Sequence, residues 1–156
     1  MKLLVPVDGS SASIDAVKKS IEIARKHNYS IKLINVVNFS SLSHLNRNER
    51  LWRYMDGSTI TESDELSKIT KENAEKLLNV IIDKLDFTDI KTEKEVLSGE
   101  PYEKILEVAK NENFDLIVMG NRGFSKIKRF FVGSVTQKVI SEAPCPVLVI
   151  HSDDNH

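Results

Sequence analysis

Residues 3–10 read Leu-Leu-Val-Pro-Val-Asp-Gly-Ser, and this stretch decides how the rest of the chain is interpreted. Its first half is a short apolar run rich in branched side chains, which predicts a buried strand. The run stops at Asp8-Gly9-Ser10, a turn sequence. Apolar residues three or four apart, from Ile14 to Ala24, then predict an amphipathic helix with Ser10 or Ser11 as its N-cap.

The same alternation of strand and helix continues to the end of the chain. Four more apolar runs predict strands at 31–37, 92–97, 116–119 and 146–150. Helical periodicity predicts helices over about 61–85, from Pro101 onward, and around Val135 to Ile140. Strands alternating with helices at this spacing form parallel sheets through right-handed crossovers. We therefore expect an α/β, Rossmann-like, doubly wound sheet of five parallel strands with helices on both faces. The strand at 92–97 is the most polar, which favours an edge position.

Length and composition suggest a single domain and exclude several classes of protein. The chain has 156 residues and a net charge of −1, so we expect one domain over 1–156 and no affinity for nucleic acid or anionic membranes. The lone cysteine, Cys145, cannot form an internal disulfide. Neither a signal peptide nor a membrane span is predicted, so we expect a soluble, cytoplasmic protein. The polar segment 38–60 lacks clear periodicity and is predicted to be a variable loop or flap.

Two strand ends carry residues suited to an anionic ligand. In doubly wound sheets, ligands bind beyond the carboxyl ends of the strands. The first strand ends at Asp8, and the fourth is followed by a segment that holds three of the six glycines of the chain, Gly120, Gly123 and Gly133. Glycine lets backbone N–H groups approach an anion, and Ser134 opens a helix whose N-terminus carries free donors. A turn followed by an N-cap explains the same residues equally well, so both interpretations stay open.

Known motifs exclude several classes of protein but do not identify the function of the chain. The chain has no Walker A sequence and no G-x-G-x-x-G after the first strand, so it is neither a P-loop NTPase nor a dinucleotide-binding protein by those criteria. A phosphate-accepting receiver domain needs an acidic residue after the third strand, where this chain has Ser98-Gly99. The basic and aromatic stretch 126–131 is too short, in a chain of neutral charge, to favour nucleic acid over a loop anchor or subunit contact. The histidines and Cys145 form no catalytic constellation, and Cys145 is expected to be a packed side chain.

Three segments together resemble the universal stress protein family over nearly the whole chain. Gly120-x2-Gly123-x9-Gly133-Ser134 resembles the G-2x-G-9x-G-[S/T] signature of its ATP-binding branch, and residues 4–10 and 143–149 are similar to the family's opening and closing segments. The resemblance implies the strand order 3-2-1-4-5, in which the first and fourth strand ends meet. One departure is Asn121, where the family often has a small hydroxyl residue.

The resemblance also implies a site for ATP, with Mg²⁺ bridging its phosphates. Pro6, Val7 and Asp8 would line the adenosine pocket, with the Asp8 carboxylate available to a ribose hydroxyl. Val36 would contact the adenine, while Met119 and Gly120 would close the other side. The phosphates would be held by Gly120, Arg122, Gly123, Gly133, Ser134, the backbone of Val135 and the hydroxyl of Thr136.

The function implied by the resemblance is an ATP-binding regulatory protein of the stress response, acting as a nucleotide-dependent switch or sensor. The family typically dimerises through its last strand, so we expect a homodimer through 146–150, together with a regulatory protein partner. Two alternatives stay open: a slow Mg²⁺-dependent ATP hydrolase and a dimeric interaction module with an empty pocket. Arg122 could stabilise charge in a hydrolase, but no general base is evident, so at most weak ATPase activity is expected.

Overall fold

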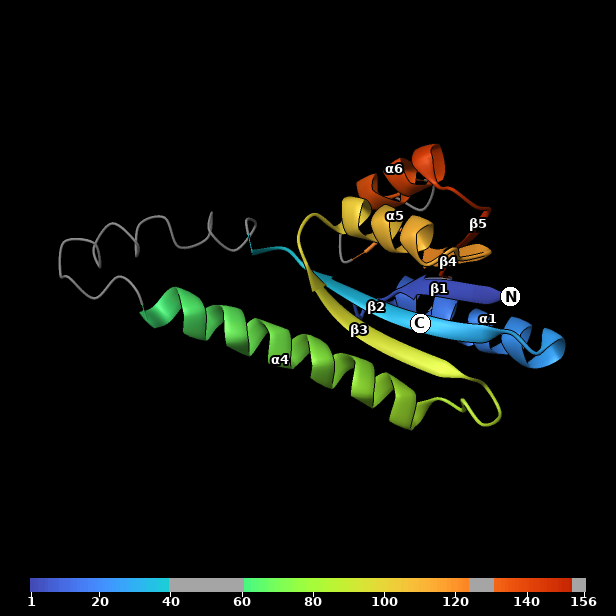
Figure 1. The fold of residues 1–156 in the computed structure, drawn as a ribbon, viewed down its shortest axis with the longest axis horizontal. Helices are drawn as coiled ribbons and strands as arrows, with labels where there is room; N and C mark the ends of the chain where they lie inside the picture. Colours follow the sequence, from blue (N-terminus) through green and yellow to red (C-terminus); the bar gives the residue numbers. More distant parts are fainter. Residues whose placement is uncertain (40–60, 124–130, 153–156) are drawn as a thin grey trace.

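The computed structural model describes residues 1–39, 61–123 and 131–152 as one alternating series of strands and helices (Figure 1). The segment 40–60, the core of the predicted loop or flap, and most of the basic and aromatic stretch 126–131 lie outside these residues. The elements are β1 (Lys2–Pro6), α1 (Ser11–His27), β2 (Ser30–Val37), α4 (Thr61–Lys84), β3 (Thr92–Ser98), α5 (Pro101–Asn111), β4 (Leu116–Gly120), α6 (Ser134–Glu142) and β5 (Val147–Ile150).

The five strands form one parallel sheet in the order β3-β2-β1-β4-β5. β1 lies at the centre, with Leu3 opposite Ile31 of β2 and opposite Leu116 of β4. The strand order reverses between β1 and β4, so the chain winds outward in both directions from the centre. The predicted fold and strand order are confirmed.

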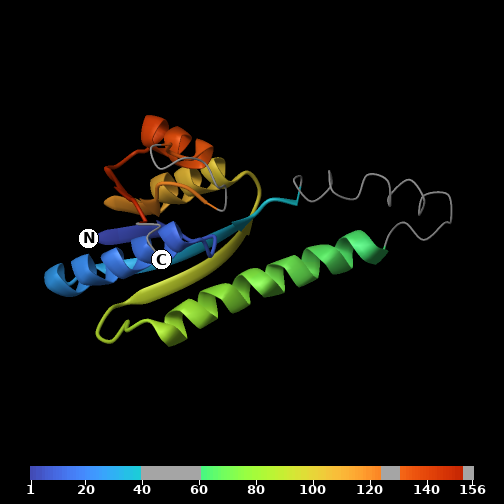
Figure 2. The ribbon, with the colours of Figure 1, turned by 180° about the vertical axis from the view of Figure 1, so that it is seen from behind.

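Two helices cover each face of the sheet, and each face has its own apolar core (Figures 1 and 2). Alternation along β1 sends Leu3 and Val5 toward α1 and α4, whereas Leu4 points toward α5 and α6. These three side chains are fully buried. Burying an aliphatic side chain of this size is worth roughly 1.5–3 kcal/mol, so the central strand anchors both layers.

The sheet edges differ in polarity. β3 forms one edge and exposes Glu93 and Lys94, which confirms its predicted position and discourages pairing with other strands. β5 forms the other edge, and its four apolar residues are all half-buried. The edge of the sheet formed by β5 is therefore more apolar than the edge formed by β3.

The helices begin with different kinds of cap. Ser10 caps α1 by accepting a hydrogen bond from the backbone of Ser13, and Pro101 is the first residue of α5, as predicted. α6 follows Gly133, which has no side chain to cap the helix. Among the residues that the structure describes, no side chain caps the first N–H groups of α6. None of the helices in the described ranges combines the length and apolarity needed to cross a membrane.

A buried lysine joins two strands and a helix at the amino end of the sheet. Lys32 of β2 is only 9% exposed, and its Nζ lies 2.6 Å from Glu112 Oε1 and 2.7 Å from Glu95 Oε2. Burial acts to lower the pKa of Lys32, but the hydrogen bonds to Glu112 and Glu95 outweigh it and raise that pKa above its ordinary value. Lys2 adds a hydrogen bond from its Nζ to the Glu112 carbonyl oxygen, at 2.5 Å. The charged groups of Lys32, Glu95 and Glu112 are thus paired with one another at the amino end of the sheet.

Candidate functional site

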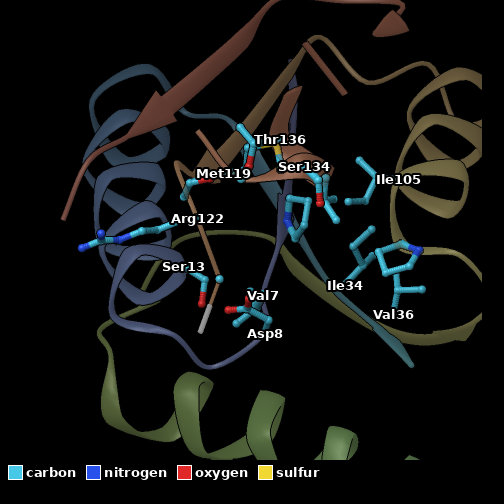
Figure 3. A pocket seen from close by; sticks show the side chains of 16 residues that line it. Val7, Asp8, Ser13, Ile34, Val36, Ile105, Met119, Arg122, Ser134 and Thr136 are labelled. Atoms are coloured by element: carbon cyan, nitrogen blue, oxygen red, sulfur yellow. Dashed lines mark hydrogen bonds between the residues drawn. The ribbon is translucent and has the colours of Figure 1, made fainter. Parts of the chain in front are cut away.

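A cavity of about 230 Å³ lies at the carboxyl ends of the central strands, where the strand order reverses (Figure 3). This is the place at which doubly wound sheets bind their ligands. All residues that the sequence assigns to the site line this cavity: Pro6, Val7, Asp8, Val36, Met119, Gly120, Arg122, Gly123, Gly133, Ser134, Val135 and Thr136. The structure therefore brings them together, although their contacts with a ligand stay a prediction.

Four further residues line the cavity and were not predicted: Ser13, Ile34, Pro101 and Ile105. For two of them the sequence contained a signal that pointed to another role. Ile105 belongs to the apolar face of α5 and Pro101 begins that helix, so both were assigned to packing and capping. Helical periodicity indicates which face is buried but not which part of it borders a cavity.

The side of the cavity between β2 and α5 is an apolar slot. Ile34 and Val36 alternate along β2 onto the same face, and Ile105 approaches from α5 (Figure 3). Ile34 and Ile105 are at most 2% exposed, so the packing of both walls is fixed by the core. Met119 adds a polarisable side chain from β4. A slot of this kind suits a flat, apolar-faced group such as a heterocyclic base.

Asp8 uses one carboxylate oxygen for the fold and leaves the other toward the cavity. Its Oδ1 accepts hydrogen bonds from the backbone N–H of Ser10, at 2.9 Å, and from the Ser10 hydroxyl, at 2.5 Å. Its Oδ2 faces the segment after β4, since a β-carbon added to Gly123 would lie 2.6 Å from that oxygen. Asp8 can therefore stabilise the turn before α1 with one oxygen and contact a ligand with the other.

The N-terminus of α6 opens on the same cavity. Gly133 and the first residues of α6 line it, and Ser134 is exposed. Without a capping side chain, the N–H groups and the partial positive charge of the helix are available to an anion. The Gly133 N–H is not among those free donors, because it bonds to the carbonyl oxygen of Asn121 at 2.7 Å.

The hydroxyl of Thr136 differs from the prediction. It is 3% exposed and donates its hydrogen bond to the carbonyl oxygen of Gly120 at 3.0 Å. A phosphate oxygen needs a donor, and this hydroxyl has given its only proton to the backbone. Thr136 therefore ties α6 to the end of β4, and its side chain acts on the site through that bond.

The glycines of the segment are needed for different reasons. A β-carbon on Gly120 would lie 2.8 Å from both the carbonyl carbon and the β-carbon of Ala12, so Gly120 allows α1 to pack closely on β4. A β-carbon on Gly133 would have Arg122 Cα as its nearest neighbour, at 3.3 Å. Gly120 is thus a packing residue as well as a lining residue, while the contact at Gly133 is also tighter than usual but longer than that at Gly120.

The side chain of Arg122 is oriented differently from the other labelled side chains, and its role toward the phosphates stays a prediction. The residue lines the cavity, but its side chain extends away from the other labelled side chains (Figure 3). The neighbouring Asn121 is 3% exposed, and its Oδ1 has no hydrogen-bond partner in the structure. In the described part of the chain, then, the cavity offers backbone N–H groups rather than an inward-pointing cationic side chain.

The described residues contain no group of three His, Cys, Asp or Glu side chains that could hold a metal ion. A cation at this site would therefore take most of its ligands from a bound molecule and water.

Burial, reinforced by the charge of Asp115, raises the pKa of the Cys145 thiol, which disfavours the reactive thiolate. This supports the predicted packing role of Cys145. His27 ends α1, as expected, and stacks on Tyr29.

The fold and the cavity together define a Rossmann-like α/β protein with a cavity at the switch point of its sheet. The chain belongs to the universal stress protein family, whose sequence profile matches residues 1–151. It is 33% identical to the universal stress protein MJ0531 of Methanocaldococcus jannaschii over 149 residues, which cover 96% of this chain and 81% of that relative.

Solved structures share the fold. Protein MJ0577 of the same organism superimposes with a TM-score of 0.80 at 25% identity, covering 99% of this chain and 97% of that one. An Arabidopsis thaliana family member with AMP bound gives a TM-score of 0.62 at 18% identity, covering 99% and 94%. A universal stress protein in complex with cAMP gives 0.59 at 20% identity, covering 98% of both chains.

Proposed function

We propose that this chain is an adenine-nucleotide-binding regulatory protein of the ATP-binding branch of its family. The observation that carries the proposal is the meeting, in one cavity, of an apolar slot and the uncapped N-terminus of α6. The slot matches the faces of a base, and the helix terminus matches a phosphate chain. Family members of the same fold that hold AMP and cAMP support the choice of an adenine nucleotide.

The residues are assigned to parts of the nucleotide by their place in the cavity. Val36 and Met119 would contact the base, joined by Ile34, Ile105 and Pro101 from the unpredicted set. The backbone at Gly123, Ser134 and Val135 would hold the phosphates. ATP is the proposed ligand because the glycine and serine spacing resembles the ATP-binding signature of the family. Mg²⁺ would be held by phosphate and water oxygens, which it prefers.

Nucleotide occupancy is proposed to act as a switch rather than to feed a catalytic cycle. The segment from Gly120 to Gly133 leads from β4 into α6, and α6 packs beside β5. A ligand that orders the start of α6 can therefore alter the surface next to the apolar edge strand. We propose that a second copy of the chain pairs through residues 146–150 and that a regulatory partner senses the bound state.

The test is to identify the small molecules that purified protein releases on denaturation, using chromatography and mass spectrometry. The proposal predicts an adenine nucleotide in the released fraction, or saturable binding when ATP is added to protein that releases none. Failure of ATP, ADP, AMP and cAMP to bind at millimolar concentration would contradict it and favour the dimeric module with an empty pocket. Phosphate release from Mg²⁺ and ATP at the buffer rate is expected, because a switch needs no turnover.

A further inference from the structure

Two helices begin at the cavity, and their starts differ in charge. Ser134 opens α6, which has no acidic residue in its first turn. Pro101 opens α5 and has no backbone N–H to offer an anion. It is preceded by Glu100, and Glu103 lies in the first turn of the helix. Carboxylates at a helix N-terminus offset its partial positive charge. The start of α5 is therefore unsuited to a phosphate and suited to a group that donates hydrogen bonds.

A polar pair, Asn38 and Glu100, lies where the two walls of the apolar slot end. Asn38 follows Val36 of β2 by two residues, and Glu100 directly precedes Pro101 of α5. Nδ2 of Asn38 donates a hydrogen bond to Oε2 of Glu100 at 3.2 Å. The pair therefore bridges the end of one wall and the start of the other, beyond the apolar side chains of Val36 and Ile105 (Figure 3).

The bond from Asn38 restricts the position of the Glu100 carboxylate and leaves it able to bind a further donor. Glu100 is exposed, so its side chain would otherwise sample several rotamers. A carboxylate accepts hydrogen bonds on both oxygens and donates none, and the amide of Asn38 uses only part of that capacity. A flat base held between the two walls turns its faces to the apolar side chains and its edges to the ends of the slot. Glu100 lies at one of these ends.

We propose that Glu100 is a specificity-determining residue, which accepts a hydrogen bond from an amino group on the edge of the base. The inference rests on the proposed nucleotide function and deepens it, because it names the feature of the base that is selected. Adenine has such a donor in its 6-amino group. Hydrogen bonds to a charged partner are stronger than neutral ones, and a base without the amino group leaves this acceptor unpaired.

The test compares Glu100→Ala with the wild-type protein by isothermal titration calorimetry. Each protein is titrated with ATP and with purine riboside 5′-triphosphate, in which hydrogen replaces the 6-amino group. Both ligands carry the same ribose and phosphates, so the ratio of their dissociation constants isolates the edge of the base. Glu100 makes no side-chain capping bond to α5, so alanine removes none. Glu103→Ala is the matched control, because it removes the same charge from the first turn of α5, where its carboxylate accepts a hydrogen bond from Tyr102 rather than from Asn38.

Wild-type protein and Glu103→Ala are expected to bind ATP at least about tenfold more tightly than the analogue, the ratio expected for one hydrogen bond to a charged group. In Glu100→Ala the ratio falls below about threefold, because only ATP loses a hydrogen bond. Circular dichroism and thermal melting verify that the variants are folded.

Three results would overturn the inference while leaving the proposed function intact. The first is equal binding of ATP and the analogue by wild-type protein. The second is a Glu100→Ala variant that keeps the full preference, since the amino group is then recognised by other atoms. The third is an equal loss of preference in Glu103→Ala, which would assign the effect to the charge of the helix start and not to a contact of Glu100. If wild-type protein binds neither ligand, the proposed function fails and the inference fails with it.

Discussion

The two ends of the sheet differ in whether their polar groups are paired within the protein. At the amino end, the buried Lys32 ammonium is matched by Glu95 and Glu112. At the carboxyl end, α6 begins without a side-chain cap, and Asp8 keeps one oxygen toward the cavity. Hydrogen-bond donors and acceptors that are left unpaired lower the stability of the fold. Folded proteins retain such groups at sites where a ligand can bind them.

The difference separates residues that stabilise the fold from residues that are available for function. Pairing at the amino end links β2, β3 and the end of α5. The carboxyl end contains the close approach of Gly120 to Ala12 and the hydrogen bond from the Thr136 hydroxyl to the Gly120 carbonyl oxygen. Substitutions at the two ends should therefore affect stability and nucleotide affinity to different degrees.

Gly120→Val is expected to have the largest effect on stability. The new side chain would be forced into the backbone of Ala12, and overpacking of this kind costs about 3 kcal/mol. Urea denaturation followed by circular dichroism measures the loss. Stability equal to wild type would show that α1 can move away from β4 at little cost, and that the close approach is not essential.

Replacing both carboxylates of the amino-end cluster, Glu95→Gln with Glu112→Gln, is expected to have the next largest effect. Lys32 would keep its charge at 11% side-chain exposure without a charged partner, at a cost of about 2 kcal/mol, below that of a fully buried pair because the glutamates are partly exposed. Nucleotide affinity should stay within about twofold of wild type, because the cluster lies at the far end of the sheet. A large change in affinity would mean that the two ends are coupled.

Gly133→Val should show the reverse pattern. A β-carbon at this position would lie 3.3 Å from Arg122 Cα, a tight contact but a longer one than the 2.8 Å at Gly120, and the backbone here has a φ of −61°. Valine is a poor N-cap, so we expect a stability loss of about 1 kcal/mol. Nucleotide affinity should fall by at least about tenfold because a branched side chain crowds the start of α6. Unfolding of the variant would instead identify Gly133 as a structural residue.

The smallest expected effect is a pH dependence at the amino end. The folded-state pKa of Lys32 is raised, so its contribution is fully present below the ordinary value of 10.5 and is lost as the pH rises through the folded-state pKa. The free energy of unfolding should therefore fall above that ordinary value by more in wild-type protein than in Lys32→Met. Equal alkaline losses in both proteins would show that the other titrating groups explain the whole effect.

The sequence predicted the fold well because strand and helix periodicities are local signals. The alternation from Leu3 to Ile150 predicts a doubly wound sheet, and the strand order implied by the family resemblance then makes Asp8 and the segment after Met119 neighbours. Conversely, the orientation of Arg122 depends on how the segment after β4 runs, and no periodicity describes that path.

Other features of the site required the packed structure. The spacing of Pro101 and Ile105 indicates a buried helix face but not that the face borders a cavity. The same is true of Thr136, where the spacing indicates a hydroxyl near the site but not that its proton is donated to Gly120. Gly120 was assigned to the ligand, and only the approach of Ala12 revealed its packing role.

The contrast between the two ends is tested most directly by two-dimensional NMR of ¹⁵N-labelled protein during a titration with ATP and Mg²⁺. The account predicts saturable shifts of the amide signals of Gly123, Ser134 and Val135, while those of Lys32, Glu95 and Glu112 stay in place. Shifts that cluster at the amino end, or none at saturating ATP, would contradict it.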